Sequence, residues 1–112
     1  MSQDPKFQLY KSSIDNQFYF RLKAKNGEII LSGEGYTTKQ NAQLGIESVK
    51  KNALIDVHYE LKDKLSNYTF NLKAANGEII GRSENYTTAA ARQTGMASVK
   101  KNASDAAVED LD

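Results

Sequence analysis

The side chains that could carry out chemistry in this sequence are few, and several of them occur twice. Glu28 and Glu78 each follow an Asn-Gly pair, and a repeated carboxylate pair suggests a general acid and a general base. The single histidine, His58, has no second histidine and no cysteine with which to form a metal site or a catalytic triad. We therefore expect no catalytic residues, no metal site and no cofactor, and we assign both glutamates to repeated hairpins.

A second group of side chains has the types found on sheet surfaces that bind nucleic acid. Alternate positions of the expected strands hold tyrosine and basic residues, which stack on bases and neutralise phosphates. The alternative is an ordinary solvated sheet face, and Glu60 on the same face weakens the binding interpretation. The candidate binding residues of this open sheet face are Tyr10, Tyr19, Arg21, Lys23, His58 and Lys73.

The segment Ser-Val-Lys-Lys-Asn-Ala occurs unchanged at residues 48–53 and 98–103. Its lysines form a basic patch if the helices that carry them lie side by side. The alternative is a helix end that occurs twice, with lysines complementing the helix dipole and Asn52 and Asn102 in the left-handed conformation that ends a helix. We favour the helix end. The lysines concerned are Lys50, Lys51, Lys100 and Lys101.

The composition indicates a small globular protein. The chain has 112 residues, of which 39% are hydrophobic and 26% charged, and it contains no cysteine. It has no apolar run near the ~18 residues that a membrane span needs, so we expect a cytoplasmic protein. Residues 104–112 hold four acidic residues and no basic one, and the rest carries 15 basic against 10 acidic residues. This mildly basic body falls short of a dedicated nucleic-acid binder, and the acidic tail either shields it or protects an edge strand.

These residues must be positioned by a duplicated unit. When residues 19–53 are aligned with residues 69–103, 21 of the 35 positions are identical. Each copy alternates apolar and polar residues over three segments and then changes to helical spacing, and an Asn-Gly pair predicts a type I′ hairpin between the second and third segments. The expected elements are strands at 6–11, 18–24 and 28–32, a helix beginning at Thr37 or Thr38 and ending near Ala53, and their counterparts in the second copy.

One unit of this size buries too little apolar surface to be stable alone, so the two units must share a core. Alternation turns Phe20, Leu22, Phe70 and Leu72 toward the helices. We expect an α+β fold in which two tandem repeats form one mainly antiparallel sheet, with both helices on one face and a pseudo-twofold axis between the repeats. The expected repeats comprise residues 6–56 and 57–110.

The motifs Asn-Gly-Glu-Ile-Ile, Tyr-Thr-Thr and Ser-Val-Lys-Lys-Asn-Ala, in this order in both copies, resemble the YegP-like family of uncharacterised bacterial proteins. The resemblance covers residues 6 to about 103. It implies a β(3)-α-β repeat, one shared sheet, and exchange of the C-terminal strands, here roughly Leu54–Val57 and Ala106–Asp110. Arg92 departs from the small residue of the first copy, Ala42. The family supplies no catalytic or binding residues to transfer.

The sequence thus predicts a small non-enzymatic interaction or ligand-binding module with an unidentified partner. We expect a monomer, because the duplication supplies within one chain the paired sheet that a single repeat reaches by dimerising. The alternative function is weak nucleic-acid binding through the open sheet face carrying Tyr19, Arg21, Lys23 and Lys73. It predicts an affinity for oligonucleotides that falls steeply as salt rises.

Overall fold

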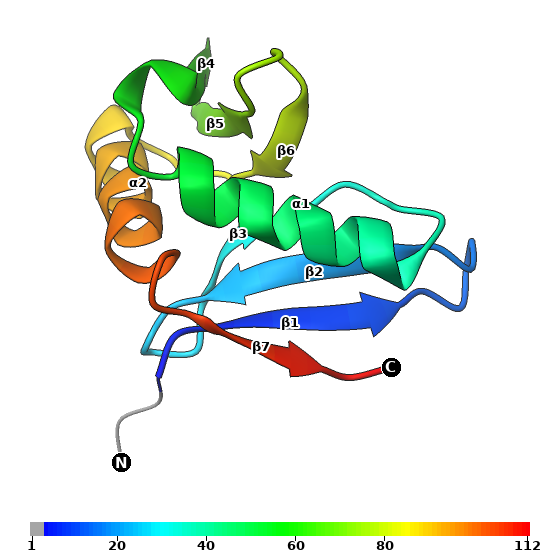
Figure 1. Ribbon diagram of the computed structural model, residues 1–112. Helices are drawn as coiled ribbons and strands as arrows, with labels where there is room; N and C mark the ends of the chain where they lie inside the picture. Colours follow the sequence, from blue (N-terminus) through cyan, green and yellow to red (C-terminus); the bar gives the residue numbers. More distant parts are fainter. Residues whose placement is uncertain (1–3) are drawn as a thin grey trace.

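Seven strands form one sheet that carries both helices on a single face (Figure 1), in a computed structural model that describes residues 4–112. The strand order is β4-β5-β6-β3-β2-β1-β7, and all neighbours are antiparallel except β1 and β7. The predicted fold is therefore confirmed. The elements are β1 (Lys6–Lys11), β2 (Phe18–Lys23), β3 (Ile29–Ser32), α1 (Lys39–Asn52), the 3-10 helix η1 (Asp56–His58), β4 (Tyr59–Lys64), β5 (Asn67–Lys73), β6 (Ile79–Arg82), α2 (Ala89–Asn102) and β7 (Ala107–Asp110).

The core lies between the sheet and the helices, as the alternation of the strands predicts. Phe20, Leu22, Phe70 and Leu72 are fully buried on the helix side of β2 and β5. The helices contribute a stripe that includes Val49 of α1 and its counterpart in α2. Because the same face of both repeats is covered, the other face of the sheet stays open. No helix within residues 4–112 is long and apolar enough to cross a membrane.

The two repeats are joined around a pseudo-twofold axis between β3 and β6. Ser32 pairs with Arg82, and these residues are equivalent positions of the two copies. Each helix packs on the third strand of the other repeat as well as on its own sheet strands, since α1 contacts β6 and α2 contacts β3. On this basis the two units share one core rather than stand as separate domains.

The Asn-Gly hairpins are present, but their turn type differs from the prediction. Gly27 has a φ of 84°, whereas Asn26 is not among the positive-φ residues, so the two-residue type I′ turn is wrong. The Gly27 N–H donates to the Ala24 carbonyl and the Ala24 N–H donates to the Glu28 carbonyl, both at 2.9 Å. A three-residue loop with glycine in the left-handed position fits this pattern.

The helix ends explain the repeated Ser-Val-Lys-Lys-Asn-Ala segment in a way that the sequence did not predict. Asn52 is the last residue of α1, and within residues 4–112 only Asn16 and Ser66 among non-glycine residues have positive φ. The left-handed assignment is therefore wrong. Instead, the Asn52 amide donates to the carbonyl of Ser48 at 2.8 Å and to its hydroxyl at 3.2 Å. Asn102 and Ser98 repeat this pair, so the serines also have a structural role.

Thr38 and Thr88 are the N-caps. Each side-chain oxygen accepts the N–H of the residue three positions on, at 3.1 Å from Asn41 and 3.0 Å from Ala91. This matches one of the two predicted starts and excludes a capping box at Thr37.

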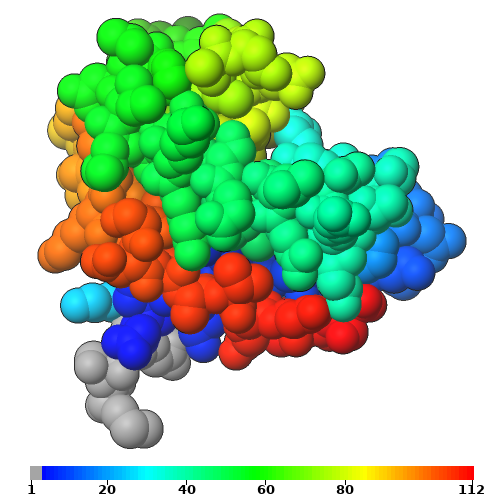
Figure 2. Space-filling view, viewed as in Figure 1, coloured from blue at the N-terminus to red at the C-terminus, as the bar shows by residue number. Residues whose placement is uncertain are grey.

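Only one of the two predicted exchanged strands exists. After α2 the chain returns to the first repeat, where β7 pairs in parallel with β1 (Figure 1; in Figure 2 the same segment, in red, runs beneath α1). After α1 the segment Leu54–Val57 is not a strand. The Ile55 N–H donates to the Asn52 carbonyl at 3.0 Å, and the His58 N–H donates to the Ile55 carbonyl at 3.1 Å. These local bonds hold a turn that leads directly into β4, which leaves the outer edge of β4 uncovered.

Candidate functional site

The open face of the first repeat carries a stack of two tyrosines and an arginine. Tyr10 on β1 and Tyr19 on β2 are register partners, and their rings stack with centroids 6.0 Å apart and planes 20° apart. The guanidinium carbon of Arg21 lies 4.9 Å from the centroid of Tyr10. We call these three residues the tyrosine–arginine ladder. A cation over a tyrosine face is attracted by the ring quadrupole, so the ladder is held in one arrangement.

The Tyr19 end of the ladder is hydrogen-bonded to the loop before β2. The Tyr19 hydroxyl donates to Asp15 Oδ2 at 2.5 Å. This bond raises the pKa of the Tyr19 hydroxyl, with smaller contributions from burial and from the charge of Asp15 itself. The same bond is the main cause that lowers the pKa of Asp15. The hydrogen bond therefore favours the protonated phenol of Tyr19 and the ionised carboxylate of Asp15.

The other end of the ladder belongs to a polar row that crosses the whole sheet. Arg21 Nε donates to Gln8 Oε1 at 2.8 Å, and Gln8 Nε2 donates to Glu109 Oε1 at 2.8 Å. On the far half of the sheet, Asn71 Nδ2 donates to Glu60 Oε1 at 3.1 Å. One register position thus crosses all seven strands in the order Glu60, Asn71, Arg82, Ser32, Arg21, Gln8 and Glu109.

The two halves of the open face differ in free positive charge. In the second repeat, Glu60 lies 2.8 Å from Lys73 Nζ and 3.8 Å from Lys62 Nζ, and the Lys73 hydrogen bond is the main cause that lowers the pKa of Glu60. Arg82 pairs with Glu34 at 2.9 Å. Arg21, by contrast, hydrogen-bonds to the neutral Gln8, and no ion pair of Arg21 occurs among residues 4–112. Arg21 therefore differs from Lys73 and Arg82 in having no carboxylate partner among these residues.

The ladder is present in only one of the two repeats. The backbone positions of Tyr10, Tyr19 and Arg21 recur in the second copy, but other residues occupy them: Lys62, Thr69 and Asn71. Gln8 is likewise replaced, by Glu60. The two repeats have the same sheet backbone, but the side chains on its open face differ. The second repeat therefore serves as an internal control for the first.

The structure places four of the predicted binding residues together and separates two others. Tyr10, Tyr19, Arg21 and Lys23 lie on the open face of β1 and β2. Lys73 lies on the same face of β5 beside Glu60, as described above.

His58 is not on the open face, and its assignment to a strand is wrong. It ends η1, and its Nδ1 lies 2.7 Å from Asn52 Oδ1 at the end of α1, on the helix side of the sheet. The helical turn of residues 56–58 rotates this side chain away from the position that strand alternation would give it.

The four lysines of the repeated segment are divided among different settings. Lys50 Nζ lies 5.8 Å from the centroid of Phe7. Lys100 Nζ lies 5.5 Å from the centroid of Tyr59 and pairs with Asp56. Lys51 is exposed in the last turn of α1. Lys101 lines a cavity at the end of α2, so these contacts do not support the single basic patch considered from sequence.

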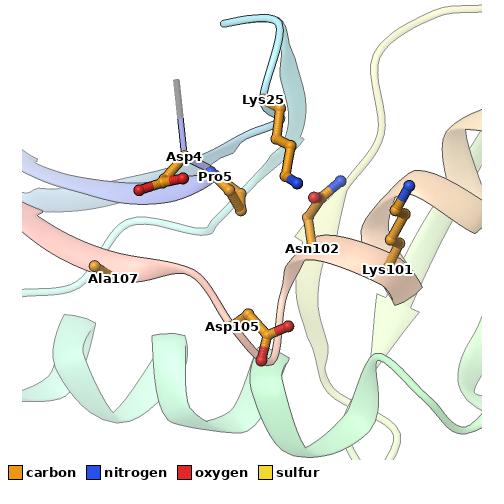
Figure 3. Close-up of a pocket in the computed structure, with 7 residues that line it drawn as sticks. All are labelled: Asp4, Pro5, Lys25, Lys101, Asn102, Asp105 and Ala107. Atoms are coloured by element: carbon orange, nitrogen blue, oxygen red, sulfur yellow. The ribbon is translucent and has the colours of Figure 1, made fainter. Parts of the chain in front are cut away.

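That cavity, of about 380 Å³, lies between the residues before β1, the turn that joins β2 to β3, and the segment from the end of α2 to β7 (Figure 3). Figure 3 shows the side chains of Lys25 and Asn102 directed toward each other across it. The Asn102 amide donates a hydrogen bond to the Ser98 carbonyl. The lining contains two lysines and two aspartates, so its formal charges cancel. Sequence reasoning did not identify this site, because its residues come from distant segments: Asp4, Pro5, Lys25, Lys101, Asn102, Asp105 and Ala107.

The repeated glutamates lie near different tyrosines. Glu28 lies in a groove with Tyr86, and its charge is a minor contribution to the raised pKa of that tyrosine, which burial mainly causes. Glu78 contributes in the same minor way at Tyr36. Each glutamate therefore lies near the tyrosine of the other repeat. Within residues 4–112, no group of three or more histidine, cysteine or acidic side chains could hold a metal ion.

Tyr59 is an ionisable group whose effect on stability can be measured. Its hydroxyl donates to the Ala53 carbonyl at 2.6 Å, and burial, with a smaller effect of Asp56, strongly raises its pKa. The folded state therefore favours the neutral phenol, and the stabilisation is complete below pH ~10 and is lost above it, where the unfolded chain ionises.

We expect Tyr59→Phe to lower the free energy of unfolding by about 1–3 kcal/mol at neutral pH, because the Ala53 carbonyl loses its partner. The variant should also lose less stability between pH ~9 and ~11 than the wild type. Urea unfolding at a series of pH values measures both effects. Phe7 occupies the equivalent position of the first repeat, so a phenylalanine fits this site. An unchanged alkaline slope in the variant would contradict the assignment.

The fold and the open face together define a class: a duplicated α+β sheet module whose two repeats share one core. The family described as Domain of unknown function (DUF1508) matches residues 13–60 and 63–110. The chain belongs to this family. The first match begins before β2 and ends two residues into β4, and the second begins within β4 and ends with β7.

Similar proteins confirm the resemblance to the YegP-like family. A segment of 56 residues is 55% identical to the UPF0339 protein YegP of Escherichia coli K12 and covers 50% of each protein, so the match spans about half the length of this relative. A segment of 48 residues is 56% identical to a UPF0339 protein of Treponema denticola and covers 43% of this chain and 81% of that relative.

Two solution NMR structures have the same fold. Protein yegP of E. coli, whose function is described as unknown, is 50% identical with a TM-score of 0.90, and the match covers 97% of this chain and 94% of that one. UPF0339 protein SO3888 of Shewanella oneidensis is 45% identical with a TM-score of 0.89, covering 97% and 92%. The family is uncharacterised, and nothing in these comparisons shows an enzymatic activity.

Proposed function

We propose that this protein is a non-enzymatic binding module of the cytoplasm that binds single-stranded nucleic acid on the open face of its first repeat. The observation that carries the proposal is the tyrosine–arginine ladder of Tyr10, Tyr19 and Arg21, which the second repeat lacks on an equivalent backbone. The ladder therefore distinguishes the open face of the first repeat from that of the second.

The chemistry of the ladder matches a chain of bases and phosphates. Each base stacked on an aromatic side chain contributes about 1–3 kcal/mol to single-strand binding, without strong sequence preference. Arg21 is anchored through Nε to Gln8, which leaves the terminal nitrogens of its guanidinium group for a phosphate. Lys23, two residues along the same face of β2, adds a second cation along the backbone path.

The binding interpretation is preferred to catalysis on the geometry of the acidic groups. A hydrolytic mechanism needs an acid and a base that meet at one substrate, whereas Glu28 and Glu78 lie beside different tyrosines of different repeats. The absence of cysteine from the sequence is in keeping with the cytoplasmic setting in which nucleic acids are available.

The test compares two double variants that each remove two positive charges from the same face. We expect Arg21→Gln with Lys23→Gln to weaken binding of a short labelled single-stranded oligonucleotide at least about tenfold. Lys62→Gln with Lys73→Gln, the control in the second repeat, should change affinity less than about threefold, because both lysines pair with Glu60 and the second repeat lacks the ladder. Fluorescence anisotropy measures both affinities.

The salt dependence and the location of binding complete the test. The logarithm of the association constant should fall with the logarithm of salt concentration, with a slope of about 0.7 for each phosphate contacted. NMR shift changes should centre on β1 and β2. Shift changes confined to the helix side, or equal losses in both double variants, would contradict the proposal.

A further inference from the structure

The sheet has two outer strands, and one of them is left without the cover that its equivalent receives. β1 is bordered by β7, and the Leu9 carbonyl of β1 accepts the N–H of Leu111 at 2.8 Å. Leu9 is fully buried. Its equivalent in β4, Leu61, is 49% exposed, because residues 54–57 form a turn and not a strand. The backbone groups that β1 uses to bind β7 are therefore at the outer edge in β4.

Exposed apolar side chains are concentrated at this uncovered edge. Of the nine large hydrophobic residues that are exposed within residues 4–112, five fall in the twelve-residue stretch that leads into β4 and ends at its hairpin turn. Isolated exposed apolar residues are normal on a surface, but a group of this kind beside an open strand marks an interaction site. The five are Leu54 (64%), Ile55 (37%), Val57 (87%), Leu61 (49%) and Leu65 (98%).

We infer that the outer edge of β4 binds the same edge of a second copy of this chain, antiparallel, with the twofold axis at Leu61. In this register Leu61 lies opposite Leu61 of the second copy. Glu60 of each copy lies opposite Lys62 of the other, so the twofold axis produces two such pairs. Leu65 of each copy falls at the level of Val57 of the other. The most exposed apolar residues of the edge thus meet each other.

The alternation of hydrogen bonds along β4 agrees with this register. In an antiparallel pair, a residue whose N–H and carbonyl both point to the partner strand forms a hydrogen-bonded pair with the residue opposite. Leu61 satisfies this condition, since the equivalent carbonyl of Leu9 points outward to β7. The two Leu61 residues would therefore exchange both backbone bonds. A twofold axis at Lys62 would instead place the two Lys62 side chains opposite each other, which is a repulsive pair.

Charged side chains usually protect an edge strand from pairing, and this holds for the opposite edge of the sheet. β7 presents Glu109 and Asp110, and its copy would repel it. β4 has the sequence Tyr-Glu-Leu-Lys-Asp-Lys, in which acidic and basic residues alternate around Leu61. Such an edge is complementary to itself when the twofold axis lies at Leu61. A dimer that forms as concentration rises thus replaces the monomer expected from the duplication.

Because the same residues face each other across the twofold axis, charge-reversal variants can test the interface. Because the interface is small, we expect sedimentation velocity of the full chain to show a monomer–dimer equilibrium between about 10 μM and about 1 mM. Lys62→Glu should be monomeric throughout, since Glu60 then faces the introduced glutamate of the other copy. Glu60→Lys should also be monomeric. A 1:1 mixture of these two variants should recover the dimer, because the charges at positions 60 and 62 then match across the two chains.

Circular dichroism of each variant establishes that it is folded. If Glu60→Lys perturbs the fold through loss of its bonds to Asn71 and Lys73, Leu61→Lys tests the same axis, because it places two lysines face to face. A wild-type chain that stays monomeric at about 1 mM overturns the inference. So does a dimer that survives both Lys62→Glu and Leu61→Lys, since it would use another surface.

Discussion

Phe20→Ala should lower the free energy of unfolding by about 3–5 kcal/mol, which is a large part of the roughly 5–15 kcal/mol typical of a small domain. Phe20 is buried at the centre of the helix face of β2, with Phe7 packed edge-on at 6.0 Å and Tyr36 stacked at 6.2 Å. A Cβ atom on Gly33 would approach the Phe20 ring to 2.4 Å, so the ring packs directly against the backbone of Gly33. Its removal creates a cavity that the packed neighbours cannot close.

The matched variant is Phe70→Ala in the second repeat, where Phe70 is also fully buried. Because each helix packs on the third strand of the other repeat, both variants should shift one common transition rather than loosen one half. Urea unfolding followed by far-UV circular dichroism and by tyrosine fluorescence provides the measurement. If the two signals separate in either variant, the repeats fold as independent units and the shared core is wrong.

Asp63→Ala should lower the free energy of unfolding by about 1–3 kcal/mol through its effect on Arg92. The Arg92 side chain is only 7% exposed at the start of α2, where its guanidinium group pairs with Asp63, donates to the Lys62 carbonyl at 3.2 Å and lies 5.4 Å from the centroid of Tyr68. Loss of the carboxylate leaves a buried charge with one neutral acceptor. We expect a smaller loss of stability than for a fully buried ion pair, since the Asp63 side chain is 66% exposed.

Arg92→Met provides the control for this prediction. It replaces the buried charge by an apolar side chain of similar length, so it should be nearly neutral, and Asp63→Ala should cost little in its presence. The Arg92 Nε atom has no hydrogen-bond partner within the described residues, which already reduces the benefit of burying the charge. Additive effects of the two changes in a double-mutant cycle would show that Asp63 and Arg92 do not depend on each other.

The sequence predicted those features that depend on regular alternation. Phe20 and Leu22 on one face and Tyr19 and Arg21 on the other follow from the two-residue period of a strand, and both assignments are confirmed. The duplicated pattern also predicted the shared sheet, because one unit has too little apolar surface to fold alone.

The features that the sequence did not predict depend on short-range hydrogen bonds or on distant segments. Asn52 is an equally good residue for a left-handed helix end and for a bond to the Ser48 carbonyl, and only the backbone angle distinguishes them. His58 was misplaced because a single turn of 3-10 helix precedes β4. The ladder of Tyr10, Tyr19 and Arg21 was recognised as a set of residues, but its stacking requires the register of two strands that are joined by a loop.

The pairing of Ser32 with Arg82 shows what duplication has made possible for this fold. In an assembly of two identical single repeats, the residue at this position must face its own copy, so an arginine there would meet an arginine. Within one chain the two positions mutate separately, and here one carries a positive charge while the other carries a small hydroxyl. Fusion of the two copies has thus removed a requirement for self-compatibility at the centre of the sheet, and selection can act on the two halves as different surfaces.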